Sequence, residues 1–147
     1  MSVRDYNTKY GVIHVTDPGP THEYDNINVY KQTPTRYVKL QGPALRAFKA
    51  AEQRITPRRW KKKNRTRHIL ITGQGYRDFG TQSELYRSDP GRYANPNYSM
   101  HVEGLAIDVD QGQGAFRLYQ IKKALLLEGW HYGVSGEPWH ASYTVTG

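Results

Sequence analysis

The sequence predicts one α+β domain in which a small antiparallel sheet is flanked by two to four helices. Residues 104–110 alternate between apolar and polar side chains, which is the two-residue period of a strand with one buried face. Residues 43–55 and 115–128 instead carry apolar side chains at helical spacing. The length of 147 residues suits a single domain with its own core.

The remaining elements follow from apolar runs and from the residues that interrupt them. The expected strands lie at 37–40, 68–72, 104–110 and 138–145. The expected helices lie at 43–55, 81–87 and 115–128, with Pro43 in the first turn, Thr81 as an N-cap and Gly129 as a stop signal. Pro57 and the basic run after it are expected as a loop. Residues 1–35 are polar and rich in turn formers, so we expect an extension, in which 10–15 can form a short strand, before a core at 36–147.

The charge of the chain is strongly positive, with a formal net charge of +8. Much of the excess lies between Arg54 and Arg67. Such a run is usually a solvated surface, but it also suits attraction to a polyanion, either nucleic acid or an anionic bacterial cell wall.

The composition also excludes several classes of site and location. The chain has no cysteine, which excludes disulfides, thiol nucleophiles and Cys-ligated zinc. The first 30 residues hold no apolar run of signal-peptide length, and no stretch approaches a membrane span. We therefore expect a product made in the cytoplasm without a signal peptide, and no membrane-spanning segment.

Four residues late in the chain have the chemistry of a catalytic metal site. His101 and Asp108 lie seven residues apart, and Glu137 precedes His140 by three. Two imidazoles and one carboxylate suit zinc and leave its fourth position open for water, while a further carboxylate can serve as general base. Pro138 opposes a helix between Glu137 and His140, so two neighbouring antiparallel strands are expected to present Asp108 and His140 on one face.

The motifs around these residues resemble a known family. The run S-x-H-x-x-G-x-A-x-D at 99–108, followed by E-P-W-H at 137–140, is similar to the D-Ala-D-Ala carboxypeptidase-type (VanY-like) zinc peptidases, which include phage L-alanyl-D-glutamate endopeptidase endolysins. The segment Gly75-Tyr76-Arg77, with Gln82 after it, matches a third motif of that family. The resemblance covers roughly residues 38 to 145.

The resemblance implies a role for each matching residue. His101, Asp108 and His140 would be ligands of Zn²⁺, although Mn or Co can replace zinc at such donors. Glu137 would be the general base. Arg77 would hold a substrate carboxylate or the developing oxyanion. Ser99 and Gln82 would line the substrate cleft.

Two residues beside these motifs are expected to support the site without binding the metal. Asp110 is a candidate hydrogen-bond acceptor for a ligand histidine, because metal-bound imidazoles usually have such a partner. Trp139 is expected to pack beneath the site.

The expected function is a peptidoglycan peptidase. The first reading is a phage-type endolysin, a monomer that reaches the wall on lysis or as part of a phage particle. The alternative is a D-alanyl-D-alanine carboxypeptidase. A third reading, a non-catalytic basic module that binds the wall or nucleic acid, leaves the zinc constellation unexplained, so no nucleic-acid partner is expected.

Overall fold

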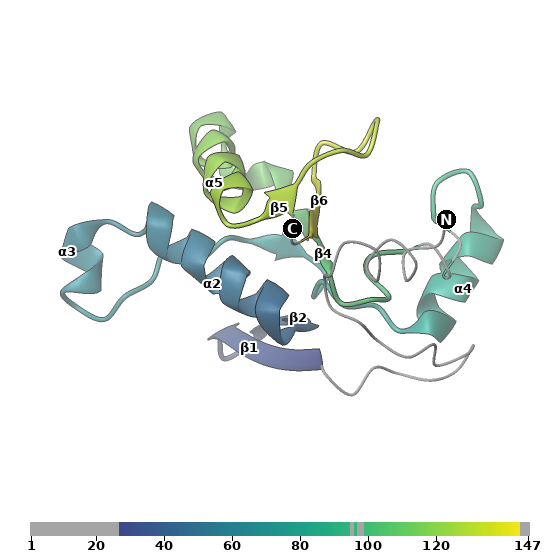
Figure 1. Cartoon of the computed structure of the whole chain (residues 1–147), viewed down its shortest axis with the longest axis horizontal. Coiled ribbons are helices and arrows are strands. Elements are labelled where there is room, and N and C mark those ends of the chain that lie inside the picture. Colours follow the sequence, from purple (N-terminus) through teal and green to yellow (C-terminus); the bar gives the residue numbers. More distant parts are fainter. Residues whose placement is uncertain (1–26, 95, 97–98, 145–147) are drawn as a thin grey trace.

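The computed structural model describes residues 27–94, 96 and 99–144 and confirms the α+β class, with two antiparallel sheets and four α-helices in these residues (Figure 1). The helices are α2 (Gly42–Ile55), α3 (Arg58–Lys61), α4 (Phe79–Ser88) and α5 (Ala115–Leu127). A short 3-10 helix, η2, spans Gln111–Gln113. The strand expected at 10–15 lies outside the described residues.

The larger sheet holds four short strands in the order β3-β4-β6-β5, and all neighbours are antiparallel. These strands are β3 (Ile71–Thr72), β4 (Ala106–Val109), β5 (Trp130–His131) and β6 (His140–Tyr143). β3 is shorter than the strand expected at 68–72, since only its last two residues pair with β4. In that register Thr72 of the edge strand β3 lies opposite Asp108 of the inner strand β4.

The smaller sheet is a hairpin of β1 (Ile27–Thr33) and β2 (Arg36–Gln41). β1 falls inside the segment expected to be an extension, so the folded unit starts earlier than residue 36. The polar character of β1 has a simple cause, because much of this strand is exposed while β2 supplies the buried Val38 and Leu40. A backbone bridge from Lys39 to the segment at Gly75 joins the hairpin to the chain that leads into α4.

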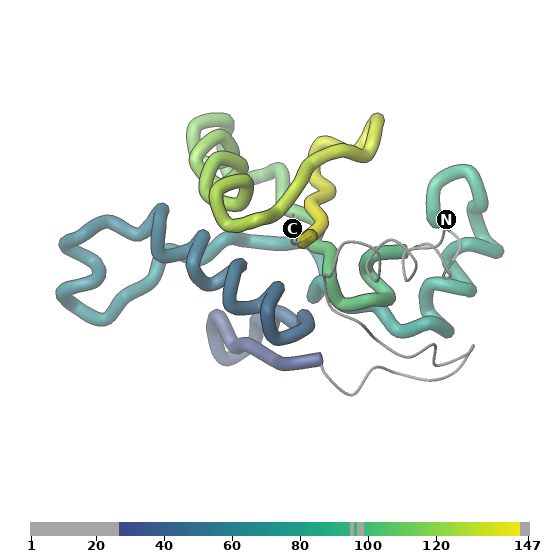
Figure 2. Tube along the Cα trace, viewed as in Figure 1, coloured from purple at the N-terminus to yellow at the C-terminus, as the bar shows by residue number. Residues whose placement is uncertain are grey.

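The core lies between α2, α5 and the larger sheet, as the ribbon and the tube both show (Figures 1 and 2). Phe48 and Ala51 of α2, Ile121 and Leu125 of α5 and Trp130 of β5 are fully or almost fully buried. In α2 the buried residues include those whose helical spacing predicted the helix, Leu45, Phe48, Ala51 and Ile55. In α5 the helix is confirmed but its buried face is not the predicted one, because Phe116, Tyr119 and Leu127 are exposed and Ile121, Ala124 and Leu125 are buried. In both views α3 and α4 lie at opposite ends of the molecule.

Two helix boundaries differ from expectation. Asp78, not Thr81, caps α4, because its carboxylate accepts a hydrogen bond of 2.7 Å from the Thr81 N–H. Residues 58–61, expected in a loop, form the single turn of α3 after Pro57. Gly129 ends α5 as predicted, with a φ of 89° that favours glycine.

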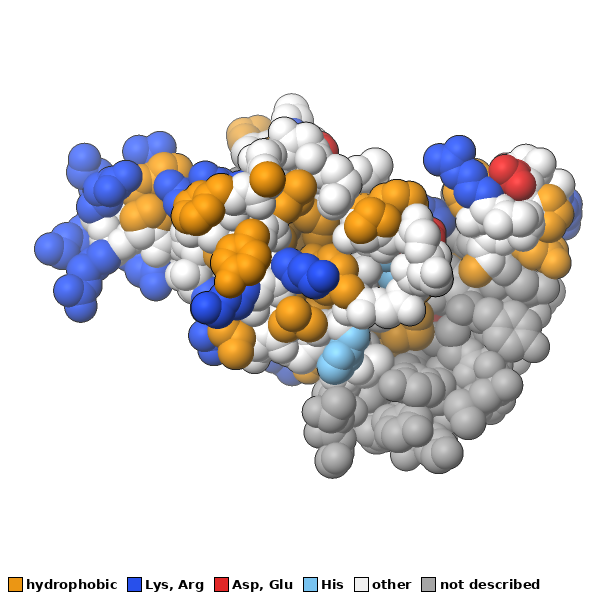
Figure 3. All heavy atoms as spheres, turned by 90° about the horizontal axis from the view of Figure 1, so that it is seen from above, with side chains coloured by type: hydrophobic (Ala, Val, Ile, Leu, Met, Phe, Trp, Pro, Cys, Tyr) orange, Lys and Arg blue, Asp and Glu red, His pale blue; other side chains and the backbone are white. Residues whose placement is uncertain are grey.

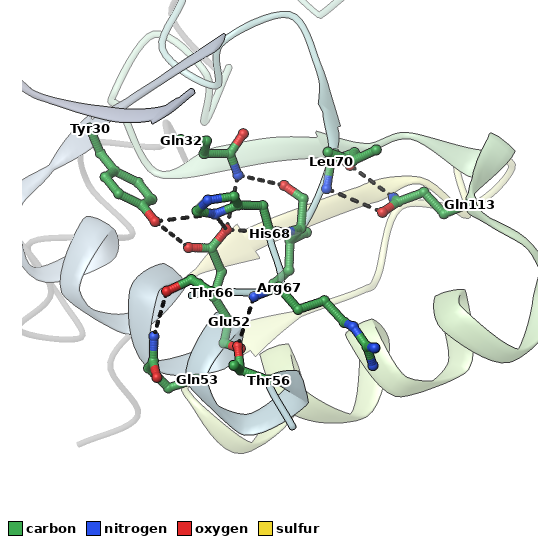
Figure 4. A network of polar contacts seen from close by, with 11 residues as sticks. Tyr30, Gln32, Glu52, Gln53, Thr56, Thr66, Arg67, His68, Leu70 and Gln113 are labelled. Carbon is green, nitrogen blue, oxygen red and sulfur yellow. Dashed lines mark hydrogen bonds and ion pairs between the residues drawn. The ribbon is translucent and has the colours of Figure 1, made fainter. Parts of the chain in front are cut away.

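A buried carboxylate ties α2 to the hairpin and to the lead-in of β3 (Figure 4). Glu52 is fully buried and accepts hydrogen bonds from Tyr30 Oη at 2.6 Å, Gln32 Nε2 at 2.9 Å and the Ile69 N–H at 3.0 Å. Its Oε2 also lies 2.9 Å from Nδ1 of His68. Burial and the Glu52 carboxylate together raise the pKa of Tyr30 above its ordinary range, so Tyr30 stays a donor.

Candidate metal centre and cleft

Asp108 on β4 and His140 on β6 face each other directly across the sheet. Residues opposite each other in antiparallel strands point to the same face, and their Cβ atoms lie about 4.5–5.5 Å apart. Nδ1 of His140 lies 3.3 Å from Oδ1 of Asp108. The expectation that neighbouring antiparallel strands present both groups on one face is confirmed.

His101 reaches the same carboxylate from the turn before β4. Gly104 closes that turn at a φ of 71°, and its N–H donates to the carbonyl of His101 at 3.1 Å. The left-handed backbone at this position favours glycine, and a Cβ here would also come too close to Cδ1 of Ile27 unless that side chain moved. The turn brings Nε2 of His101 to 3.2 Å from Oδ1 of Asp108.

The distances from Asp108 to both histidines fit two edges of a tetrahedral metal site. Their potential ligand atoms lie within 4.8 Å of one another. Ligand atoms about 2.0–2.1 Å from zinc at the corners of a tetrahedron lie roughly 3.3–3.4 Å apart. The observed separations of 3.2 and 3.3 Å from the Asp108 oxygen match that edge length.

The second nitrogen of each imidazole fixes which nitrogen is free for a metal. Nδ1 of His101 lies 2.8 Å from the carbonyl oxygen of Gly75, which can only accept, so Nδ1 carries the proton. In a neutral ring the lone pair of Nε2 then faces the Asp108 carboxylate. Two acceptors facing each other repel unless a proton or a cation lies between them, and a metal ion relieves that repulsion.

His140 is arranged with its two nitrogens reversed. Its Nδ1 faces Asp108 and its Nε2 lies 2.9 Å from the hydroxyl oxygen of Ser142. Asp110, considered as such a partner, is engaged elsewhere: its Oδ1 accepts from the Gly112 N–H at 2.8 Å and caps η2. The partners of the ligand histidines are therefore Gly75 and Ser142.

Asp108 carries its negative charge in a largely enclosed position. Burial alone would raise the pKa of its carboxyl, but hydrogen bonds and positive charge from His101 and His140 outweigh that effect and hold the pKa well below its usual range. Arg77 adds a more distant cation, with Nη2 4.0 Å from Oδ2. The carboxylate is thus held ionised, which is the form that binds a metal.

The metal-ligand set lies in an open cleft of about 1180 Å³. The cleft brings together the residues to which the resemblance assigns roles: Arg77, Gln82, Ser99, His101, Asp108, Glu137 and His140 all line it. Glu137 enters through a turn in which its carbonyl accepts from the His140 N–H at 3.1 Å. Trp139 was expected beneath the site but lines the cleft with 36 % of its surface exposed.

Arg77 is held in place by Gln82 and by the backbone. Its Nη1 donates to Oε1 of Gln82 at 2.7 Å, and its N–H donates to the His101 carbonyl at 3.1 Å. Gln82 is almost fully buried, and its Nε2 donates to the Ala94 carbonyl at 2.7 Å. The guanidinium therefore stands beside the ligand set, with its direction fixed by a buried amide.

Ser142 is the functional candidate that the sequence analysis missed. It follows His140 by two residues on β6, and residues at that spacing share one face of a strand. The alternation that was applied to His140 also places Ser142 on the same face, so the signal was present in the sequence. Gly75 gave no such signal, because it acts through its carbonyl oxygen.

Comparison with known proteins supports the resemblance predicted from the motifs. No family model matches the chain. A D-alanyl-D-alanine carboxypeptidase of Enterococcus faecium is 33 % identical over 93 residues, which cover 52 % of this chain. The match spans only 30 % of that relative's length.

Three solved structures share the fold. The LdcB LD-carboxypeptidase aligns over 86 % of this chain and 72 % of its own, with a TM-score of 0.57 and 17 % identity. VanYB in complex with D-alanine-D-alanine aligns over 88 % and 83 %, with a TM-score of 0.54 and 17 % identity. The D,D-pentapeptidase VanY in complex with Zn(II) aligns over 82 % and 80 %, with a TM-score of 0.50 and 16 % identity. The resemblance to VanY-like zinc peptidases is confirmed in sequence and in fold.

The sequence predicts no membrane-spanning segment, and the structure bears on that prediction for the described residues alone. Among them, no helix combines the length and the apolar character that crossing a membrane requires.

Proposed function

We propose that this chain, a protein of VanY-like fold, is a zinc-dependent peptidase that hydrolyses an amide bond in the stem peptide of bacterial peptidoglycan. One observation carries the proposal: His101, Asp108 and His140 bring three potential ligand atoms within 4.8 Å of one another, inside a cleft that also holds a carboxylate and an arginine. The relatives named above act on, or are bound to, peptidoglycan or D-alanyl-D-alanine, which supports this substrate class.

The residues of the chain divide the chemistry between them. Zinc, when bound, would polarise the scissile carbonyl and lower the pKa of water. Glu137 would accept the proton of the attacking water and deliver it to the leaving nitrogen. His101, Asp108 and His140 would position the metal. The hydrogen bonds that His101 donates to the Gly75 carbonyl and that His140 forms with the Ser142 hydroxyl would keep both rings oriented.

Arg77 would bind the carboxylate of the leaving group. Its Nη1 is occupied by Gln82, while the rest of the guanidinium faces the cleft and can bind a carboxylate by charge-assisted hydrogen bonds. Ser99, buried at the cleft wall, would contact the substrate backbone together with Gln82. These side chains would set the distance between the bound carboxylate and the scissile bond.

The same arginine suits two different bonds. In a terminal D-alanyl-D-alanine unit, the carbon that bears the scissile nitrogen also bears a free carboxylate. The same holds for L-alanyl-γ-D-glutamate, because the chain continues through the side-chain carboxyl. We therefore keep two candidates: the L-alanyl-D-glutamate endopeptidase indicated by the endolysin members of the family, and the D,D-carboxypeptidase indicated by the curated relative.

The endopeptidase candidate carries further implications. It describes a phage-type lytic enzyme, a monomer with peptidoglycan as its partner, that meets the wall on release or within a phage particle. The carboxypeptidase candidate trims one terminal residue and leaves the wall connected. The two outcomes differ in product mass, so one digestion separates them.

The deciding experiment is digestion of defined muropeptides by the zinc-loaded chain, read by mass spectrometry with and without a chelator. New L-alanine and D-glutamate termini identify the endopeptidase, and loss of one terminal D-alanine identifies the carboxypeptidase. No product from any muropeptide with zinc bound would refute the proposed function.

A set of variants tests the assigned roles. Glu137→Ala should keep zinc and lose turnover, whereas His101→Ala and His140→Ala should lose both. A fully active Glu137→Ala protein would exclude Glu137 as the base. If the unmodified chain and all of these variants bind the wall and none of them hydrolyses it, the result would indicate the non-catalytic basic module instead.

A further inference from the structure

The strongest positive charge of the molecule lies on a projection formed by α3 and the turn after it. Seven Lys and Arg and no acidic residue occur between residues 58 and 67. Six of these cations are exposed: Arg58, Arg59, Lys61, Lys62, Lys63 and Arg65. Figure 3 shows Lys and Arg side chains gathered at the α3 end of the molecule. We call these six residues the basic projection.

The basic projection is an ordered part of the fold. Two guanidinium groups lie over the ring of Trp60, with Arg65 4.7 Å and Arg67 4.8 Å from its centroid. The Arg65 N–H donates to the Trp60 carbonyl at 3.0 Å, which closes the turn. At its base, the Arg67 N–H donates to Thr56 Oγ1 at 3.0 Å, and Gln53 donates to Thr66 (Figure 4).

The six cations are held together without compensating acids. Among the described residues, no carboxylate lies within ion-pair distance of any of them. Two like charges about 4 Å apart repel by about 1 kcal/mol in water, and less at greater distances. A fixed group of uncompensated cations is relieved by binding a chain of anions, which also releases the counterions of that chain.

The chemistry of the projection favours one kind of polyanion. Trp60 is the only aromatic residue between 53 and 67, and its ring is engaged by Arg65 and Arg67, so no ring is left on which a nucleobase could stack. What the surface offers is charge alone, on a projecting end. This suits a flexible phosphate polymer without aromatic groups.

We propose that the basic projection binds anionic phosphodiester polymers of the bacterial wall, in which phosphates are joined by short polyols. The choice of a wall polymer rests on the proposed function, which places this protein at peptidoglycan. α3 lies at the opposite end of the molecule from α4, whose Gln82 lines the cleft, so polymer and stem peptide can be bound together. Such attachment raises the local concentration of cleavable peptides around the enzyme.

The test measures binding of the full chain to poly(glycerol phosphate) by calorimetry. The variant K61Q/K62Q/K63Q removes three exposed charges and leaves Trp60, Arg65 and Arg67 in place. The control K31Q/R36Q/K123Q removes three exposed charges from other faces. We expect the first variant to bind at least tenfold more weakly and the control to stay within twofold of the unmodified chain.

Salt supplies a second measure of the same contact. For flexible single strands, the logarithm of the binding constant falls by about 0.7 per contacted phosphate for each unit rise in the logarithm of the salt concentration. The K61Q/K62Q/K63Q variant should therefore lose about 2 from that slope. Equal weakening in both triple variants would overturn the proposal, since binding would then follow net charge alone.

Single-stranded poly-dT at equal phosphate concentration tests the nucleic-acid alternative. Tighter binding of poly-dT than of poly(glycerol phosphate) would also overturn the proposal. The proposed peptidase activity is measured separately, on soluble muropeptides without polymer. A chain that binds polymer but cleaves no muropeptide refutes the activity alone, and one that cleaves muropeptides but ignores polymer refutes the docking alone.

Discussion

Removing one hydroxyl, in Ser142→Ala, should weaken metal binding without touching a ligand. The Ser142 oxygen lies 2.9 Å from Nε2 of His140, on the far side of the ring from Asp108. When Nδ1 holds the metal, Nε2 carries the proton and donates it to this oxygen. The hydrogen bond holds the direction of the ring, so the ligand nitrogen is already aimed when the metal arrives.

The size of the effect follows from two considerations. A neutral hydrogen bond contributes about 0.5–1.5 kcal/mol net. Loss of a partner behind a ligand imidazole typically costs about 10–100-fold in metal affinity. The two ranges meet near tenfold, or about 1.4 kcal/mol, which is our expectation for Ser142→Ala.

The measurement is a zinc titration in competition with a chromophoric chelator at fixed pH. Ser135→Ala is the matched control, because Ser135 lines the same cleft and forms no hydrogen bond through its side chain with another described residue. Ser142→Thr keeps the hydroxyl on a strand position and should retain most of the affinity. An unchanged zinc affinity in Ser142→Ala would show that this hydrogen bond does not orient His140.

Three further perturbations test the scaffold. Gly104→Ala should lower the free energy of unfolding by at least about 1–3 kcal/mol, from the left-handed backbone and the contact with Ile27, and urea unfolding indistinguishable from the unmodified chain would contradict this. Glu52→Leu should lower the free energy of unfolding by roughly 2–4 kcal/mol, because the buried Ile69 N–H loses its acceptor. Glu52→Gln should lower it by less, and equal losses in the two variants would argue against the hydrogen-bond explanation. Saturating zinc at 100 times its dissociation constant should stabilise the chain by about 2.7 kcal/mol, which a chelator should reverse in a thermal melt; a melt insensitive to both would exclude a bound native-state metal.

The parts of the site that the sequence predicted depend on local periodicity. The alternation around Asp108 defines which side chains share its face, and Pro138 excludes a helix before His140. Together they predict that Asp108 and His140 can share one side of an antiparallel pair, and the register confirms that they do. The helix at 42–55 was predictable for the same reason, since it buries the apolar stripe that the spacing indicated. The helix at 115–127 was predicted in its extent but not in its buried face, which holds Ile121, Ala124 and Leu125.

The parts that the sequence did not predict depend on distant contacts. β1 is polar and lacks a strong strand pattern, and it forms because β2 pairs with it and because Glu52 binds Tyr30 and Gln32. The ordering of the basic segment depends on Trp60 and on the two arginines over its ring, which follow it by five and seven residues. Neither arrangement leaves a periodic trace, so pattern reasoning assigns an extension and a loop.

The backbone bridge between Lys39 and the segment at Gly75 has a practical consequence for defining the minimal domain. The N–H of Lys39 donates to the Gln74 carbonyl at 2.7 Å, and the neighbouring Gly75 carbonyl orients His101. A truncated protein starting at residue 36 would keep every ligand yet lose β1. It would expose the freed edge of β2 to other chains, and edges of that kind promote aggregation. Poor solubility of such a fragment would then reflect a missing structural strand, so an expression boundary upstream of Ile27 is needed to keep the hairpin intact.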